Sequence, residues 1–190
     1  HPEDSVPLPS SEIEHGVDVM GCSPIVLLDR DEMLTRGSAR NRLQIPPDSI
    51  AIYVQLGAGE INDIGSEIRM TIDALLAHPN VHIIIGESMI GKRLDISFER
   101  VHIIRDYPNS MYFPAFDATI QAGGYNSFHE IRNFGMPTLF YPNMETGMDD
   151  QVARCKVSES EGWGIVLTER KEKNIKTGVQ GLLKHPKVQS

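Results

Sequence analysis

DATIQAGGYNSFHEIRNFGMPTLFYP (117–142) contains one complete strand–helix–strand unit. The run 117–122 predicts a strand that ends at a pair of glycines. Residues 126–135 predict a helix, which Gly135 and Pro137 close, and residues 138–142 predict a second strand. A strand, a crossover helix and another strand over so short a stretch are typical of a parallel sheet.

The same alternation extends in both directions from this unit. Further strands are predicted at 50–56, 81–86, 101–105 and 164–167, and further helices at 66–78, 109–114, 149–160 and 171–184. The predicted strands are apolar along most of their length, as expected when helices cover both faces of a sheet. The predicted fold class is therefore α/β, with a single Rossmann-like, doubly wound and mostly parallel sheet.

Residues 1–49 lack this alternation and are expected to form a separate segment. Residues 1–24 carry four prolines and little periodicity, and IVLL (25–28) leads into a short predicted helix that ends before Pro46 and Pro47. We expect a linker and an interdomain helix over 1–49, followed by one α/β domain over 50–190. The chain begins at His1 rather than Met, so we expect it to be part of something longer or a processed product.

Composition excludes several classes of protein. The 190 residues hold 18 Lys and Arg against 26 Asp and Glu, a net charge of -8 that disfavours general nucleic-acid binding. Cys22 and Cys155 lie far apart, which excludes a disulfide framework or a Cys-rich zinc site and suits a reducing, cytoplasmic location. No apolar run approaches the roughly 20 residues that a membrane-spanning helix needs.

The loop LGAGEIND (56–63) follows a predicted strand and precedes a predicted helix. Glycines let the backbone approach a phosphate, and the amino end of a helix favours negative charge. A dinucleotide fingerprint would need a third glycine at Asn62, and no GK[ST] sequence of a P-loop follows. A tight turn without a ligand explains these residues equally well.

The loop QAGGYNSFHEIRNFGMP (121–137) carries Gly123 and Gly124 after a predicted strand. Ser127 and Glu130 have the spacing of a capping box, and in one interpretation they only cap the helix. In the other, N–H groups of residues 124–127 and the Ser127 hydroxyl hold a pyrophosphate, while Glu130 accepts two hydrogen bonds from a ribose diol. The residues alone leave both interpretations open.

The loop YPNMETGMDDQVARC (141–155) places Asp149, Asp150 and Gln151 at the start of a predicted helix. Acidic residues in a first turn usually act as caps and dipole partners, and the alternative is hydrogen bonding to sugar hydroxyls. HEIRN (129–133) lacks the second histidine of a zinc-protease helix, and the sequence contains no GxSxG elbow.

Together the three loops resemble the C-terminal, donor-binding domain of GT-B fold glycosyltransferases that use UDP-sugars. The nearest pattern is that of the bacterial peptidoglycan N-acetylglucosaminyl transferases and their relatives in glycosyltransferase family 28. The family's glycine, Ser/Thr, Glu, GxP, strand-ending Pro and Gln fall on Gly124, Ser127, Glu130, Gly135, Pro137, Pro142 and Gln151. YVQLGAG (53–59) resembles the family's glycine loop, and the resemblance spans residues 50–184.

The resemblance implies a role for each loop and makes 50–190 a nucleotide-sugar-binding domain. Ile104 and Arg105 would hold the uracil through backbone groups, and Asp150 and Gln151 would contact the donor sugar. The family has Gln where Asp150 stands, so the identity of the sugar does not carry over. Glu130 would bind the ribose, and the diphosphate contacts would come from Gly57, Ala58, Gly59, Gly123, Gly124 and Ser127.

The implied activity is transfer of a hexosyl group from a UDP-sugar, the substrate, to an acceptor. The chain would be the C-terminal half of the enzyme and catalytically incomplete alone. Its acceptor site and catalytic base would lie in an N-terminal domain, supplied in the same chain or by another. No cofactor is expected, and no metal, because no DxD motif adjoins a phosphate loop and helix N-termini would stabilise the leaving UDP.

Three alternatives are weighed against the transferase. A nucleotide-sugar epimerase of the same fold and a non-catalytic UDP-sugar-binding module both stay open. A nicotinamide-binding Rossmann domain is disfavoured by Asn62 and by the lack of an acidic residue ending the second strand at Gly86. A peripheral membrane contact is compatible with the resemblance, because the family's acceptors are sometimes lipid-linked.

Overall fold

The computed structural model describes residues 24–56, 64–86, 98–144 and 149–189. Its six strands are β1 (Ile50–Gln55), β2 (Val81–Gly86), β3 (Val101–Ile104), β4 (Ala118–Gln121), β5 (Thr138–Phe140) and β6 (Gly164–Val166). Its helices are α2 (Arg36–Arg42), α3 (Ile64–Leu76), the 3-10 helix η1 (Asn109–Ala115), α4 (Tyr125–Phe134), α5 (Gln151–Ser160), α6 (Glu172–Leu183) and α7 (Pro186–Gln189).

The strands form one sheet in the order β3-β2-β1-β4-β5-β6, and every neighbouring pair is parallel. Chain order therefore runs outward in both directions from β1 and β4, which pair directly at Val54↔Ile120 and Gln55↔Gln121. In open α/β sheets, ligands bind beyond the carboxyl ends of the strands at such a switch in order. The predicted fold class, a Rossmann-like doubly wound sheet, is confirmed.

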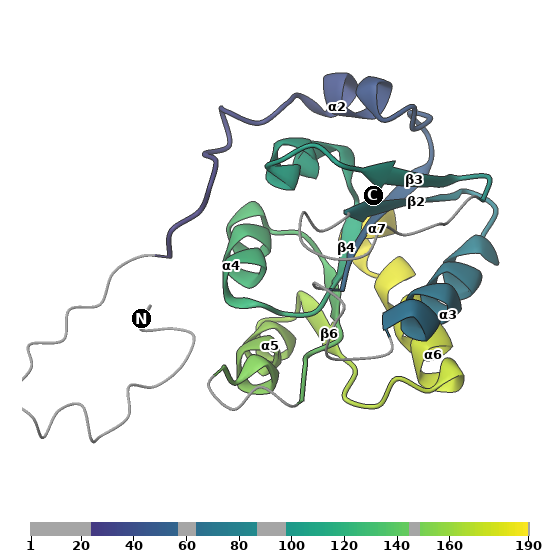
Figure 1. Ribbon diagram of the computed structural model, residues 1–190, viewed down its shortest axis with the longest axis vertical. Coiled ribbons are helices and arrows are strands. Elements are labelled where there is room, and N and C mark those ends of the chain that lie inside the picture. Colours follow the sequence, from purple (N-terminus) through teal and green to yellow (C-terminus); the bar gives the residue numbers. More distant parts are fainter. Residues whose placement is uncertain (1–23, 57–63, 87–97, 145–148, 190) are drawn as a thin grey trace, which may run out of the picture.

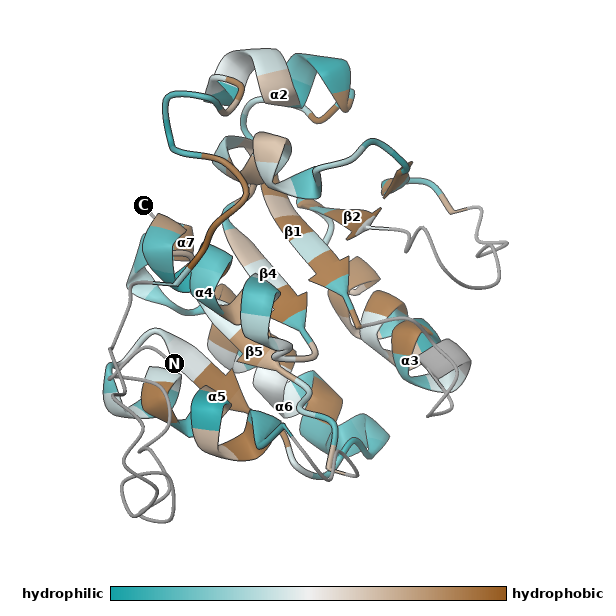
Figure 2. Cartoon of the chain, turned by 60° about the vertical axis from the view of Figure 1, so that its left-hand side comes forward, coloured by the Kyte–Doolittle hydropathy of each residue, from teal (hydrophilic) through white to brown (hydrophobic). Residues whose placement is uncertain are grey.

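Helices cover both faces of the sheet (Figure 1). On one face α3 and α6 pack against Ile52 and Val54 of β1, and on the other α2, η1 and α4 pack against Ala51 and Tyr53. A smaller cluster joins α4, β5 and α5. Because successive side chains of a strand point to opposite faces, both sets of β1 positions must be apolar, and Figure 2 shows the brown strands lying inside the more hydrophilic helices.

α2, which the sequence assigns to the connecting segment, packs on the sheet domain through a buried arginine. The Arg40 guanidinium donates to the carbonyls of Ala115, Pro46, Pro47 and Ser49 and pairs with Asp117 at 2.8 Å. Asp117 also accepts from the Ala51 amide at 2.8 Å. Because Arg36 of α2 also pairs with Asp117, at 2.7 Å, this carboxylate ties α2 to the amino ends of β1 and β4 through two ion pairs.

The predicted helices and strands of 50–190 are all present, with ends shifted by up to two residues. The helix expected before Pro46 is α2. The segment expected at 109–114 forms η1, a tighter helix that contains Pro114. None of the described helices combines the length and apolar character needed to span a lipid bilayer.

Candidate functional site

The amino end of α4 lies at the carboxyl edge of the sheet, directly after β4. Gly123 has φ +85°, which favours glycine, and Gly124 is the N-cap residue with extended backbone (φ −57°, ψ 150°). No side chain in the described part of the chain caps this helix, and a Cβ added to Gly124 would meet nothing within 4 Å. The first N–H groups of a helix lack intrahelical partners, so this end is chemically suited to an anion.

The capping-box interpretation of Ser127 and Glu130 is wrong. α4 begins at Tyr125, so Ser127 is its third residue, inside the helix rather than at its cap. The Glu130 carboxylate does not reach back to the cap but accepts a hydrogen bond from the Leu27 amide at 3.2 Å. Gly124 takes the cap position, three residues before Ser127.

Glu130 is half-buried, and this burial raises the pKa of its carboxyl group, while the Leu27 hydrogen bond opposes the shift. Its negative charge adds to burial in raising the pKa of the Tyr53 phenol. The Tyr53 hydroxyl donates to Gln55 Oε1 and accepts from Asn109 Nδ2, both at 3.0 Å, near the carboxyl end of β1. The Glu130 carboxylate is therefore near enough to Tyr53 of β1 for its charge to act on that phenol.

The start of α5 forms a second set of polar groups. Asp150 is the N-cap and accepts from the Ala153 amide at 2.9 Å, as the capping interpretation of this acid predicted. Gln151 Oε1 accepts from the Asn143 amide at 3.0 Å. Asp149 pairs with Arg154. Carboxylate and amide oxygens with remaining acceptor capacity therefore lie at this helix start.

Arg154 and Cys155 of α5 both contact Gly123 in the turn before α4. Neither residue was predicted to be functional from the sequence. Arg154 is 4% exposed, and its Nη1 donates to the Gly123 carbonyl at 2.9 Å. A Cβ on Gly123 would lie 2.4 Å from Cys155 Sγ, so only glycine fits there. The available signal was the spacing of Arg154, which is next to Cys155 and four residues before Ser158. This spacing puts the arginine on the same side of the helix as these two small residues, and that side is buried.

Ile104 and Arg105 lie at the end of β3, one of the two edge strands of the described sheet. Ile104 is buried and pairs with Gly86, and Arg105 is exposed. At a strand spacing of about 4.8 Å, β3 lies roughly 14 Å from β4. These residues therefore share the carboxyl edge with the α4 turn but lie well to one side of it.

Gly57, Ala58 and Gly59, the remaining predicted diphosphate contacts, lie outside the described residues. The described chain reaches Leu56 directly after β1, which is the neighbour of β4.

Two exposed apolar side chains also follow strands at this edge: Tyr107 after β3 is 64% exposed, and Met144 after β5 is 54% exposed.

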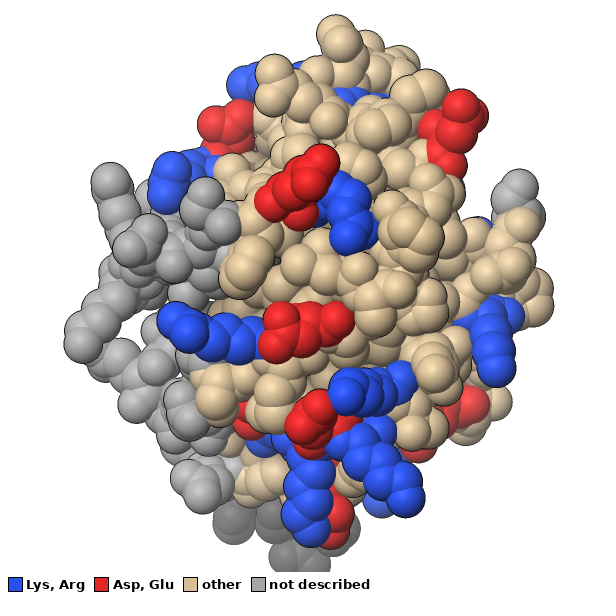
Figure 3. Space-filling view, turned by 90° about the vertical axis from the view of Figure 1, so that its right-hand side faces the viewer, with Lys and Arg blue, Asp and Glu red and all other residues tan. Residues whose placement is uncertain are grey.

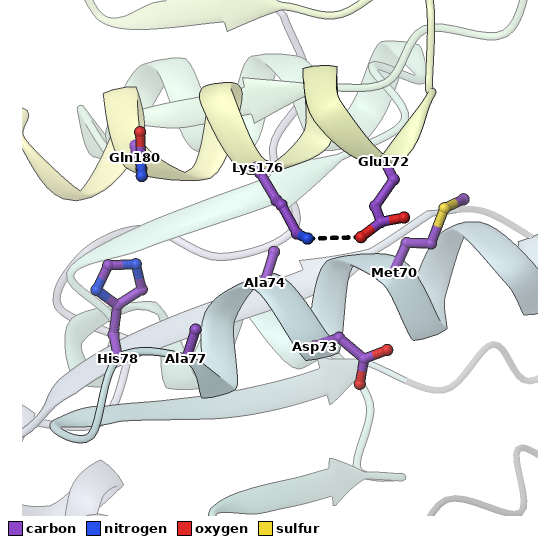
Figure 4. Close-up of a pocket in the computed structure, with 8 residues that line it drawn as sticks. All are labelled: Met70, Asp73, Ala74, Ala77, His78, Glu172, Lys176 and Gln180. Carbon is purple, nitrogen blue, oxygen red and sulfur yellow. Dashed lines mark hydrogen bonds and ion pairs between the residues drawn. The ribbon is translucent and has the colours of Figure 1, made fainter.

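A pocket of about 420 Å³ lies away from this edge, between α3 and α6 (Figure 4). Its charged groups include Glu172 and Lys176, which pair with each other at 2.5 Å. On this side of the molecule charges of both signs are interspersed (Figure 3). Within the described ranges no three His, Cys, Asp or Glu side chains are arranged to hold a metal ion.

The fold is similar to that of part of several solved glycosyltransferases. The chain superposes on the glycotransferase of kitacinnamycin with a TM-score of 0.67 and 17% identity, over 98% of this chain and 46% of that one. The spinosyn rhamnosyltransferase SpnG gives a TM-score of 0.66 and 15% identity, over 91% and 46%. The calicheamicin glycosyltransferase CalG4 gives 0.59 and 21%, over 75% and 36%.

One curated relative connects the sequence to the resemblance drawn from its loops. It is the UDP-N-acetylglucosamine–N-acetylmuramyl-(pentapeptide) pyrophosphoryl-undecaprenol N-acetylglucosamine transferase of Aquifex aeolicus (strain VF5), 22% identical over 144 residues. These residues are 74% of this chain and 41% of the relative, so the chain spans less than half the length of the protein it matches. No protein-family model matches the chain.

Proposed function

We propose that this chain is the donor-binding half of a glycosyltransferase that uses a nucleoside-diphosphate sugar. The observation that carries the proposal is the uncapped amino end of α4, which opens beside Gly124 at the switch in strand order. The chain shares its fold with sugar transferases, and one structure of SpnG is complexed with thymidine diphosphate. The transferases named above give the epimerase interpretation no support.

In the proposed complex, the diphosphate lies at the amino end of α4, against Gly123, Gly124 and Ser127 and the loop of Gly57, Ala58 and Gly59. Glu130 accepts hydrogen bonds from the ribose hydroxyls, in exchange for or beside the Leu27 amide. The base lies towards Ile104 and Arg105, and the sugar towards Asp150 and Gln151. Base identity, uracil or thymine, is part of the test.

The proposed reaction is attack of an acceptor nucleophile on the anomeric carbon of the donor. The bond from this carbon to the diphosphate oxygen breaks, and negative charge develops on the leaving nucleotide. Fixed N–H groups and the α4 dipole stabilise that charge where it appears. The acceptor site and catalytic base are proposed to come from a second domain. The apolar side chains of Tyr107 and Met144, exposed at the carboxyl edge, favour a covering domain on this side.

Titration calorimetry of the chain with UDP and with TDP tests the proposal. Glu130→Ala removes a charged acceptor and should weaken binding by about 1.5–3 kcal/mol. Glu172→Ala, on the exposed surface of α6, is the matched control and should bind as the wild type does. An unchanged affinity in Glu130→Ala contradicts the ribose role, and no binding by the wild type contradicts the donor site altogether.

We also propose that donor binding needs no metal ion. The same titration in EDTA should give the same affinity, because backbone N–H groups rather than a cation balance the phosphate charge. A loss of affinity in EDTA that magnesium restores would refute this part of the proposal.

A further inference from the structure

The buried guanidinium of Arg154 joins two loops that differ in their proposed ligand contacts. Its Nη1 donates to the Gly123 carbonyl after β4, and its Nη2 pairs with Asp149 before α5. Its carbon atom Cζ lies 5.3 Å from the centre of the Tyr125 ring at the start of α4. The same side chain thus contacts the turn proposed for the diphosphate and the segment proposed for the sugar.

Burial of an arginine is costly unless its charge and its N–H groups are satisfied. Asp149 balances the charge of Arg154, but the buried Nε has no partner in the described part of the chain. The side chain is therefore retained at some cost to folding. Its geometry indicates what it gains, because the Gly123 carbonyl is a backbone acceptor directly before the open end of α4.

A trans peptide is planar, and its C=O and N–H point in opposite directions. When Arg154 holds the Gly123 carbonyl towards α5, the N–H of Gly124 in the same peptide must point away from α5. No Cβ is present at Gly124, and the space beside it is open. Cys155 Sγ closes the other side of Gly123, so the peptide plane has little freedom to rotate.

We propose that Arg154 is a positioning residue, which aims the Gly124 N–H at the donor's diphosphate without touching the ligand itself. The inference rests on the proposed function, and it adds to that function a residue that no family position supplied. Arg154 also couples the position of the turn before α4 to that of the segment before α5, because Asp149 and Gly123 are held by the same guanidinium.

The test compares the affinities for UDP and for uridine, since only UDP has phosphates to meet the Gly124 N–H. Arg154→Lys keeps the charge but cannot bridge Gly123 and Asp149 with a planar fork. It should lower UDP affinity by about 10-fold or more, the loss expected for a hydrogen bond to a charged group. Uridine affinity should stay within about 2-fold of the wild type.

Arg132→Gln is the matched control, because Arg132 joins α4 to Glu161 beyond the other end of α5 at 2.5 Å. It should leave the UDP-to-uridine affinity ratio unchanged. If Arg154→Lys does not fold, as judged by circular dichroism, Asp149→Asn decides, because it frees one anchor of the guanidinium at a partly exposed site. This variant should lower the ratio in the same direction.

Folded variants with a wild-type ratio overturn the inference, whether UDP affinity is retained or both affinities fall together. Full UDP affinity in Arg154→Lys shows that charge alone suffices and also overturns it. A wild-type chain that binds neither UDP nor uridine instead refutes the proposed function. The two failures are therefore distinguishable.

Discussion

At the scale of single residues, the turn before α4 depends on a glycine that is required twice. Gly123 needs a positive φ, and Cys155 Sγ occupies the space of its missing side chain. Either requirement excludes most residues, and together they make this the least replaceable position of the turn. The sequence showed two adjacent glycines but not which of them the packing demands.

Gly123→Ala should therefore lower the free energy of unfolding by about 2–4 kcal/mol, from backbone strain and overpacking combined. Gly162→Ala is the control, since Gly162 also has a positive φ (+78°) but has open space around it. It should cost about 1–2 kcal/mol, the backbone contribution alone. Urea unfolding of both variants measures the difference, and equal costs would contradict the role of Cys155.

Glu130 carries a charge that folding disfavours. Its pKa is raised above the ordinary 4.5 by burial, so the folded state is penalised as the pH rises through the folded pKa. Below the unfolded pKa, both states are protonated and the penalty vanishes. Retaining such a group is typical of a binding site rather than of a structural surface.

Glu130→Gln should accordingly be more stable than the wild type at pH 7 and equally stable near pH 4. The glutamine oxygen still accepts from the Leu27 amide, so only the charge is lost. Urea unfolding at the two pH values measures the effect. A variant that is less stable at pH 7 would show that the ionised form is favoured in the fold.

The residue roles separate into those that local chemistry could predict and those that packing decides. The glycine pair, Glu130 and the Asp150 cap follow from residue types at known spacings, although the ligand contacts assigned to them remain predictions. The Leu27 amide and Arg154 come from segments distant in sequence, so no local pattern indicates that they meet Glu130 and Gly123. The capping-box pattern placed the helix cap at Ser127, but the helix begins one turn earlier, after Gly124.

At the scale of elements, the strands were predictable because both of their faces are buried. An apolar run bounded by glycine or a turn has few alternative structures in an α/β chain. Helix ends were less predictable, since caps are set by local hydrogen bonds within a residue or two. The docking of α2 was not predicted, because it depends on Arg40 and Asp117, which are 77 positions apart.

Asp117→Ala should detach α2 and lower the free energy of unfolding by about 2–4 kcal/mol. The change leaves the buried Arg40 guanidinium without a counter-charge and the Ala51 amide without its acceptor. Lys171→Ala, which removes an exposed pair with Glu169, should leave stability unchanged. Chemical denaturation measures both, and a neutral Asp117→Ala would show that the carbonyls alone satisfy Arg40.

At the scale of the whole molecule, strand order places the candidate residues together. Gly123, Gly124, Glu130, Asp150 and Gln151 follow β4 and β5, and β1, which ends at Gln55, pairs directly with β4. The sequence predicted a parallel, doubly wound sheet but could not order its strands, because crossover length does not say on which side of β1 a strand pairs. The chain spans less than half the length of the relatives that it matches.

The packing of Cys155 against Gly123 means that the rate of thiol modification can report how often α5 separates from the turn before α4. The thiol is 0% exposed, and burial raises its pKa to about 12, so almost none of it is thiolate at pH 8. In a Cys22→Ser background, a thiol reagent should modify Cys155 only when α5 separates from the turn, and saturating UDP should slow that modification. Rapid labelling of the native chain would mean that α5 separates from the turn often. The labelling half-time would then measure how fast this separation occurs.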